Sequence, residues 1–396
     1  MTESIRGSAP PAGASATGGG LRRRRRRRWA VRAGAALTVL LLAAAGTGVL
    51  LYAKLDGNIT ADEAAARELA RYEKERPTAL TKDAQNILLI GSDSRADDNA
   101  RYGRDSGTER SDTTILLHLS TGRHSATAVS LPRDLMVDVP ACLRRDGTRG
   151  EPMFAMFNHA FEVGGSACTI RTVEKLTGIR VDHHVVVDFS GFKEMVDAVD
   201  GVEICLAHPV DDKDAHLRLP AGRVTLDGEQ ALGYVRARKS LGDGSDTDRM
   251  ERQQRFLAAL VNKVRGNDVL LNPVKLYPVL DAATSSLTTD PELAHLRGLY
   301  QLVRGLRDIP TEHVQFMTVP RESYVYNANR DQLVEPEAER LFDLLRADRP
   351  VKVTDKPAGG YGPYGSGDGK TSDAAGASAS PDPAFRGNTA AENTCE

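Results

Sequence analysis

The chain has 396 residues, a formal net charge of −2, 40% hydrophobic residues and 27% charged residues. This composition excludes a largely disordered or fibrous protein, and the length provides enough apolar material for a substantial core. The small net charge hides an asymmetry, because Arg22–Arg28 is an unbroken run of arginines. Acidic residues are spread through the rest of the chain.

The segment Ala33–Ala53 contains no charged residue. A helix over 33–53 would rise roughly 30 Å, enough to cross a bilayer. The arginine run directly before it predicts, by the positive-inside rule, a single-pass plasma-membrane protein whose residues 1–32 form a disordered cytoplasmic tail and whose catalytic domain is extracellular. A cleaved signal peptide is the alternative. We expect no nucleic-acid binding, because the span already explains the arginines.

The rest of the chain divides by composition into three parts. Residues 54–82 are predicted to form a juxtamembrane helical spacer, which begins at a capping box made by Thr60 and Glu63. Residues 83–349 form one domain. Residues 350–396 are rich in Gly, Ser, Asp, Ala and Pro, which predicts a disordered tail.

The four cysteines leave the redox state open. No CxxC pair is present, and no histidine cluster has zinc-ligand spacing. An extracellular domain permits disulfides. Cys142 and Cys168 lie in a region rich in loop-forming residues, which favours that pair. The alternative is that Cys142, Cys168 and Cys205 are all buried thiols.

Three short apolar runs begin the domain. Ile87–Ile90, Ile115–Leu119 and Ala126–Leu131 are rich in branched residues and bounded by turn formers, which predicts buried strands. Acids and arginines stand at the ends of these runs: Asp93, Arg95, Arg110, Asp112, Arg133 and Asp134. In open α/β sheets ligands bind at strand ends. The pattern therefore predicts a site for a metal-bound anionic ligand such as a phosphate.

The next segment alternates between strand and helix patterns. A strand is predicted at Val185–Phe189, a helix at Phe192–Val199 and a strand at Val202–Leu206. Strand, helix and strand with short connections are typical of a layered α/β sheet.

A second group of cations follows. We predict a strand over Tyr234–Lys239, in which Arg236 and Arg238 would point to one face and hold an anion between them. Two solvated surface arginines are the alternative. In the helix that follows, Arg249 and Gln253 lie one turn apart. Arg249 stands on the first turn, where the helix dipole also favours an anion.

Five ordered blocks together resemble the LytR–CpsA–Psr family of cell-envelope proteins, of the actinobacterial type. The blocks are NILLIGSDSR, RSDTT, SLPRD, LTGIRVDHHVVVDFSGF, and YVRARK followed by DRMERQQRFL. They extend over about residues 84–265. The chain departs from the family at Met156, where members often have a basic residue.

The resemblance implies a fold, an activity and a set of site residues. The fold is a three-layer α/β/α sandwich with a mixed central sheet. The activity is a phosphotransferase that attaches a glycopolymer from a polyprenyl-pyrophosphate carrier to peptidoglycan, with Mg²⁺ or Mn²⁺ as cofactor and the carrier lipid in an apolar tunnel. The resemblance gives Asp93, Asp112, Arg133 and Arg238 as catalytic residues and Asp93 and Asp112 as metal ligands. It gives the pyrophosphate-binding residues as Arg110, Arg133, Arg236, Arg238, Arg249 and Gln253.

The same residues leave two other functions open. A hydrolase would pass the phosphoryl group to water, and the sequence does not show the acceptor. A non-enzymatic regulator or scaffold would only bind lipid-linked sugars, but it would have no need for two acids beside five arginines. No Walker loop, GxSxG motif or zinc motif indicates a competing chemistry.

Overall fold

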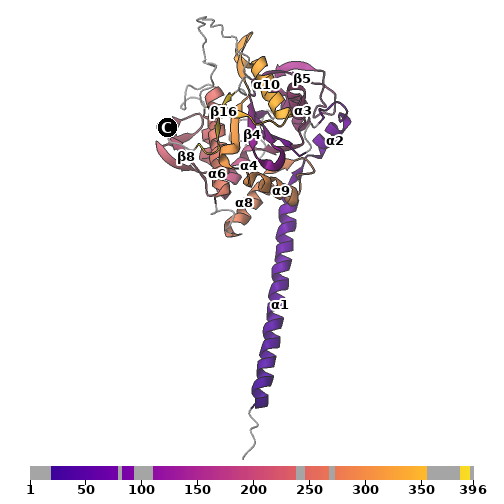
Figure 1. The fold of residues 1–396 in the computed structure, drawn as a ribbon, viewed down its shortest axis with the longest axis vertical. Helices are drawn as coiled ribbons and strands as arrows, with labels where there is room; N and C mark the ends of the chain where they lie inside the picture. Colours follow the sequence, from indigo (N-terminus) through magenta and orange to yellow (C-terminus); the bar gives the residue numbers. More distant parts are fainter. Residues whose placement is uncertain are drawn as a thin grey trace, which may run out of the picture. The chain divides into compact units, whose positions relative to one another are not determined.

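The structure is a computed structural model that describes residues 19–78, 83–92, 110–237, 246–266, 273–354 and 384–392. It contains two compact units, Met1–Lys54 and Leu55–Glu396. The first unit is dominated by helix α1, Gly19–Asn58, the long helix in Figure 1. Its part from Arg28 to Asn58 contains an uncharged apolar stretch and is long and apolar enough for a membrane anchor or a signal sequence.

The prediction that residues 1–32 are disordered is wrong for its second half, because α1 begins at Gly19. Arginine, leucine and alanine are strong helix formers, so the helix extends N-terminally from the apolar segment through the arginine run. Residues 1–18 lie outside the described residues.

The second unit is built on a nine-stranded mixed sheet, as predicted. Its strand order is β1-β12-β7-β2-β3-β4-β13-β17-β16. In that order the strands are Thr60–Ala61, Leu287–Thr289, His183–Val187, Gln85–Ser92, Ser111–Leu119, Ala126–Leu131, Val314–Thr318, Ala384–Thr389 and Lys352–Thr354. The predicted strands over the three apolar runs are confirmed as β2, β3 and β4.

Alternate residues of the central strands face opposite layers of helices. Leu88 and Ile90 of β2 join the core cluster under α2 (Glu63–Arg71), α3 (His159–Thr177) and α10 (Glu335–Arg346). Ile87 joins the core cluster on the other face, under α6 (Asp246–Arg265) and α9 (Leu296–Arg307). Because a strand alternates its side chains, one buried strand supplies both cores. The layers confirm the predicted α/β/α sandwich, with helices around β4 in Figure 1.

A third core cluster lies beside the sandwich. It contains residues of α4 (Phe189–Ala198), α5 (Gly228–Arg236) and α6, together with two hairpins. The strand predicted at Val202–Leu206 exists as β8, but it pairs with β11 (Gly222–Leu226) and not with the central sheet. The second hairpin joins β9 (Val210–Asp212) to β10 (Leu217–Leu219), and α8 (Pro273–Ser285) is a further helix of the unit.

Residues 54–78, predicted as a spacer, are integrated into the domain. Leu55 and Ile59 are buried, and Thr60 pairs with Thr288 in the central sheet. The predicted capping box is therefore wrong, because Thr60 is extended. Asp62 caps α2 instead, with its carboxylate accepting the backbone N–H of Ala65 at 2.9 Å.

The predicted disordered tail is also wrong where the structure describes it. Strand β17 pairs with β13 on one side and with β16 on the other. Phe385 of β17 is buried in the core cluster under α10. A short strand gives a weak pattern in a segment of Gly, Ser and Pro, so composition alone missed it. Residues 355–383 and 393–396 lie outside the described residues.

The strand predicted at Tyr234–Lys239 is wrong. Residues 228–236 form helix α5, which begins with a capping box between Asp227 and Gln230. The capping box satisfies two backbone donors at the start of the helix and favours it over an extended segment. Arg236 therefore lies in the last helical turn, and Arg238 lies outside the described residues.

A disulfide closes the loop between the sheet and α3. Cys142 and Cys168 are bonded, with their Cα atoms 5.6 Å apart, which confirms the predicted pair. Cys205 is also disulfide-bonded. The chain is thus a disulfide-containing protein, as expected of a domain folded outside the reducing cytoplasm.

Removing the first disulfide should destabilise the domain strongly. The bond joins residues separated by 26 positions, and a cross-link closing such a loop contributes about 3 kcal/mol. We expect the double variant Cys142→Ala/Cys168→Ala to unfold at lower denaturant concentration than the wild type. Adding a reducing agent to this variant then measures how much the disulfide at Cys205 contributes to stability. An unchanged midpoint in the double variant would contradict the expectation.

Candidate functional site

The sheet brings the charged residues to one edge. Strands β2 and β7 are parallel, as are β4 and β13, and β3 runs antiparallel to both β2 and β4. The carboxyl ends of β2, β4, β7 and β13 therefore meet at one edge, where β3 begins and Ser92 pairs with Ser111. Asp112 and Arg133 lie at this edge. Asp93 follows β2 directly, but it is outside the described residues.

Arg133 is the centre of this edge. Its Nη1 donates to Asp112 Oδ1 at 2.9 Å, and its Nε lies 3.4 Å from Asp134 Oδ2. The second contact is an ion pair without hydrogen-bond geometry. The backbone also fixes the corner, because the Asn158 N–H donates to the Arg133 carbonyl at 3.1 Å. The Arg133 side chain is 17% exposed and the Asp112 side chain 34% exposed, so the corner stays open to solvent.

Arg110 is oriented by a residue that the sequence analysis missed. Its Nε donates to Glu162 at 3.1 Å, and His159 Nδ1 contacts the same oxygen at 3.1 Å. Burial alone would raise the pKa of the Glu162 carboxyl, but the hydrogen bonds from His159 and Arg110 outweigh it and lower that pKa. The spacing of His159 and Glu162, three residues apart at the start of a helix, is the signal that could have found this contact.

Arg236 lies over an aromatic ring. Its guanidinium carbon is 4.6 Å from the centre of the Phe189 ring. Phe189 is the first residue of α4, and Asp188 caps that helix directly after β7. The stacking holds the cation near the carboxyl end of β7.

Helix α6 places Arg249 near the same edge. Gln254 donates to Ser130 Oγ at 3.2 Å and to Thr318 Oγ1 at 3.0 Å, so α6 lies over the carboxyl ends of β4 and β13. Arg249 is 5% exposed and lies five residues earlier in the helix. Gln253 donates to the Val235 carbonyl at 3.2 Å, which ties α6 to the last turn of α5. Its predicted contact with pyrophosphate stays a prediction.

Two more arginines belong to the edge and were not predicted. Arg321 follows β13 and contacts Asp331 and the Thr247 hydroxyl of α6. Arg330 Nη1 lies 3.4 Å from Asp134 Oδ1. Both stand on the hairpin of β14 (Arg321–Tyr324) and β15 (Asn327–Leu333), outside every motif that the sequence analysis used.

The donor groups at this edge fit a hard divalent cation. Mg²⁺ and Mn²⁺ prefer carboxylate oxygens and are held through one or two of them together with substrate phosphates. Asp112 offers a partly exposed carboxylate beside Arg133. Met156 pairs with Met136 in the hairpin of β5 (Met136–Val139) and β6 (Met153–Met156), and it adds no charge.

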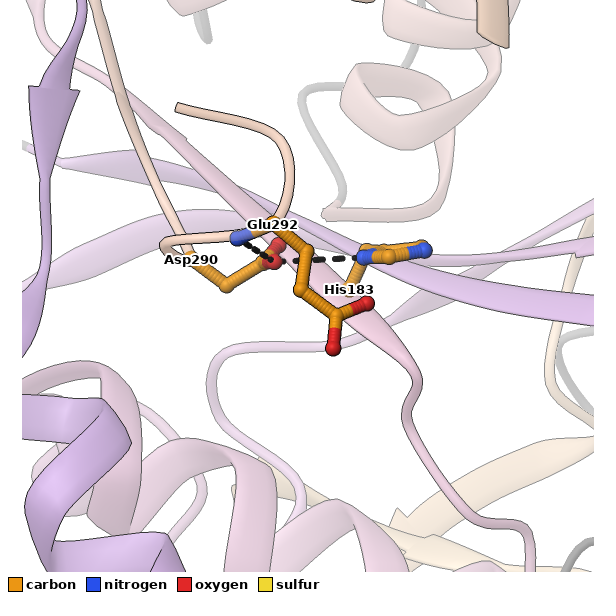
Figure 2. A group of neighbouring side chains, drawn as sticks. All are labelled: His183, Asp290 and Glu292. Atoms are coloured by element: carbon orange, nitrogen blue, oxygen red, sulfur yellow. Dashed lines mark hydrogen bonds and ion pairs between the residues drawn. The ribbon is translucent and has the colours of Figure 1, made fainter. Parts of the chain in front are cut away.

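A second possible metal-ligating group lies elsewhere in the unit. Figure 2 shows His183, Asp290 and Glu292, whose ligand atoms lie within 4.8 Å of one another. His183 pairs with Ile87, whereas the edge that carries Arg133 and Asp112, called the arginine edge below, is at Ser92. At about 3.3 Å per residue, these two ends of β2 are about 16 Å apart.

Hydrogen bonds within the chain explain this second group. Asp290 Oδ1 lies 3.2 Å from His183 Nδ1 and accepts the Glu292 N–H at 3.0 Å, the two dashed contacts in Figure 2. Its Oδ2 accepts the His184 N–H at 3.2 Å. The network links β7 to the loop after β12, so it has a structural role without an ion.

The His183–Asp290 pair predicts a pH-dependent contribution to stability. Burial alone would lower the pKa of His183, but the hydrogen bond and charge of Asp290 outweigh it and raise that pKa above its usual value of 6.5. A raised folded-state pKa stabilises the fold below about pH 6.5, and the contribution is lost as the pH rises through the folded value.

We therefore expect the difference in melting temperature between wild type and His183→Gln to be largest near pH 6 and to shrink toward pH 9. The exposed His216, changed to Gln, is the control for losing an imidazole. A difference that is constant from pH 6 to pH 9 would show that the charge of His183 does not contribute.

The apolar faces of α4 and α6, which are candidate walls for the lipid tunnel implied by the resemblance, are partly core. The Phe192 ring of α4 lies 5.4 Å from the Phe256 ring of α6, and Val196 and Phe256 are fully buried in the third cluster. A cavity of about 310 Å³ is lined by residues that include Tyr72, Pro140 and Glu174, and its lining does not include Arg133. A tunnel stays a prediction of the resemblance.

Comparison with known proteins gives one consistent result. The profile of the LytR_cpsA_psr family matches residues 52–347. The chain is 38% identical over 291 residues to a probable cell wall biosynthesis protein, LcpB, of Corynebacterium glutamicum, covering 70% of this chain and 65% of that protein. It is 34% identical over 223 residues to the polyisoprenyl-teichoic acid–peptidoglycan teichoic acid transferase TagU of Enterococcus faecalis, covering 56% and 66%. It thus spans just under two thirds of each relative's length.

The fold is also similar to solved structures. A LytR-Csp2A-Psr enzyme from Actinomyces oris superposes with a TM-score of 0.54 at 21% identity, covering 68% of this chain and 93% of that one. At this identity the likeness concerns the fold alone, and it agrees with the α/β sandwich described above.

Proposed function

Since this chain belongs to the LytR–CpsA–Psr family, we propose that it is a membrane-anchored phosphotransferase that attaches a glycopolymer from a polyprenyl-pyrophosphate carrier to peptidoglycan. The name of the Enterococcus relative describes a transfer of this class. The observation that carries the proposal is the edge where Arg133 contacts Asp112 at 2.9 Å. Arg110 directly precedes β3 at this edge, and Arg236 lies over Phe189, close after the end of β7. Arg249 stands on α6, whose Gln254 contacts the ends of β4 and β13.

The chemistry requires cations at this position. The acceptor hydroxyl oxygen bonds to the phosphorus next to the glycopolymer, and the bond from that phosphorus to the polyprenyl phosphate breaks. Negative charge moves onto the leaving phosphate and the equatorial oxygens. Fixed guanidiniums stabilise this charge without reorganising, which is the main source of catalysis in phosphoryl transfer.

The carboxylates have two proposed roles. An aspartate at the edge takes the proton of the acceptor hydroxyl, and Asp93 and Asp112 are the candidates. Asp93 and Asp112 are also the proposed ligands of Mg²⁺ or Mn²⁺. When bound, the ion would neutralise phosphate charge as a Lewis acid. Arg133, held by Asp112 and Asp134, keeps its planar donor face oriented toward the edge.

The proposed location follows from α1. An apolar helix preceded by arginines supports a single-pass plasma-membrane protein with the N-terminus in the cytoplasm and the domain outside. A reporter enzyme that folds only outside the cytoplasm, fused after Glu396 so that β17 stays intact, should be active. Activity of a cytoplasm-only reporter at that position would contradict the topology and exclude the proposed substrate.

The transfer itself can be tested with the full chain in lipid nanodiscs. A soluble fragment that begins at Thr60 is unsuitable, because it would lack the buried residues Leu55 and Ile59. The protein is mixed with a lipid-linked glycopolymer and peptidoglycan, with and without Mg²⁺. We expect polymer bound covalently to peptidoglycan and release of polyprenyl phosphate. Release of polymer into solution would indicate the hydrolase, and binding without any product would indicate the scaffold.

A further inference from the structure

An exposed group of aromatic side chains lies beside the arginine edge. In the described part of the second unit, the large hydrophobic side chains that are most exposed are Phe154, Tyr300, Val303, Val325 and Tyr326. Three of these five belong to one cluster. We call Phe154, Tyr324, Val325 and Tyr326 the aromatic patch.

The rings of the patch contact one another. The Phe154 and Tyr324 ring centres are 6.1 Å apart, and those of Tyr324 and Tyr326 are 5.4 Å apart with an angle of 65° between the ring planes. Phe154 comes from β6, whereas the tyrosines come from the β14–β15 hairpin. Yet Phe154 is 55% exposed and Tyr326 is 85% exposed. Apolar rings that are held in place but left exposed are typical of a binding surface.

The two hairpins that carry the aromatic patch also contact the arginine edge. The Asp331 N–H donates to the Asp134 carbonyl at 3.1 Å, and Arg330 contacts the Asp134 carboxylate. In the other hairpin, Phe154 pairs with Asp138 of β5. From Leu135, which bridges Asp331, to Asp138 the strand rises about 10 Å. The hairpin that carries the two tyrosines therefore contacts Asp134, the residue after Arg133. Phe154 lies only a few residues further along the neighbouring strand, so the patch is close to Arg133.

The chemistry of the patch favours sugars over a charged surface. A tyrosine offers a flat apolar ring and a polar tip, which suit the C–H face and the hydroxyls of a pyranose. Both arginines of the hairpin are engaged by carboxylates, Arg321 by Asp331 and Arg330 by Asp134. They are therefore poorly placed to hold anionic lipid headgroups. Glu322 and Gln332 add hydrogen-bonding groups beside the rings.

We propose that the aromatic patch binds the glycan strand of the peptidoglycan acceptor and so directs a hydroxyl of that strand toward Arg133. The proposal rests on the proposed transfer for its acceptor. A polymeric acceptor continues beyond the sugar that reacts, so it needs a surface beside the site. Tyr326 and Phe154 act as specificity-determining contacts for the acceptor strand. The reaction itself takes place at the arginine edge.

Binding is tested without the reaction. Full-chain protein in detergent is sedimented with insoluble peptidoglycan stripped of glycopolymers, comparing wild type, Phe154→Ala, Tyr326→Ala and Tyr326→Phe. Tyr300→Ala, which removes an equally exposed ring on α9, is the matched control. We expect each alanine variant in the patch to weaken binding by about three- to tenfold. Tyr326→Phe, which keeps the ring and loses only the hydroxyl, should weaken binding less than Tyr326→Ala, and Tyr300→Ala should bind like wild type.

Transfer kinetics then separate this proposal from the proposed function. Tyr326→Ala should raise KM for the peptidoglycan acceptor and leave KM for the lipid-linked donor unchanged. An increase in donor KM alone, or loss of binding to phosphatidylglycerol vesicles in place of peptidoglycan, would overturn the assignment. Equal sedimentation of all variants would also overturn it. Patch-dependent sedimentation by a protein that transfers nothing would support the patch and contradict the transferase.

Discussion

Arg133→Lys is expected to lower the rate of glycopolymer transfer by a factor of roughly 10²–10³, the usual effect of removing one transition-state contact. Lysine keeps the positive charge, but it loses the planar donor group that contacts Asp112 at 2.9 Å and approaches Asp134. If the site needed only positive charge, lysine would be tolerated. The variant therefore tests whether transfer depends on the planar donor geometry of Arg133 or only on its positive charge.

The melting temperature of the variant is the control for this experiment. Arg133 lies between two carboxylates at a partly exposed corner, so we expect the lysine variant to melt within a few degrees of wild type. Arg223→Lys is the matched control, because Arg223 pairs with Glu203 at 2.8 Å on the β8–β11 hairpin, an ordinary exposed ion pair. Near-normal transfer by Arg133→Lys, or its unfolding, would contradict the role given to Arg133.

Phe385→Ala is expected to have the largest effect on stability, about 3–5 kcal/mol, although Phe385 lies in a segment whose composition is typical of disorder. Phe385 is 6% exposed and packs into the core with α10, on a strand that completes the central sheet. The expected result is a clear decrease in the free energy of unfolding measured with denaturant.

Phe154→Ala is the control for Phe385→Ala. It also removes a phenylalanine ring from a strand, but from a position that is 55% exposed, so it should cost less than about 0.5 kcal/mol. A chain truncated after Thr354 should be at least as unstable as Phe385→Ala, because it also loses the pairing of β17 with β13. Equal stability of Phe385→Ala and Phe154→Ala would show that β17 is not part of the cooperative fold.

The sequence predicted the central strands well because their pattern is strong. Branched apolar runs at Ile87–Ile90 and Ala126–Leu131 are buried on both faces, and nothing but a central strand accommodates them. The acids and arginines at their ends then had to meet at one edge. This physical reason places Asp112 beside Arg133, although the two are separated along the chain.

The residues that were wrongly assigned or missed from the sequence also have physical explanations. Arg236 was assigned to a strand in which it would share a face with Arg238, but the capping box at Asp227 starts a helix that continues through Arg236. Arg321 and Arg330 were missed because their role depends on Asp134 and Asp331, contacts made only in the folded chain. Glu162 was missed for the same reason, since Arg110 reaches it from another element.

The most direct test of the central claim is to identify the product by mass spectrometry. The full chain acts on a lipid-linked glycopolymer and peptidoglycan in water labelled with heavy oxygen. If the arginine edge transfers the phosphoryl group to an acceptor hydroxyl, the product is a phosphodiester between polymer and peptidoglycan that contains no heavy oxygen. Its yield should fall in Arg133→Lys and not in Arg223→Lys. Free polymer phosphate carrying heavy oxygen, with no linked peptidoglycan, would contradict the account.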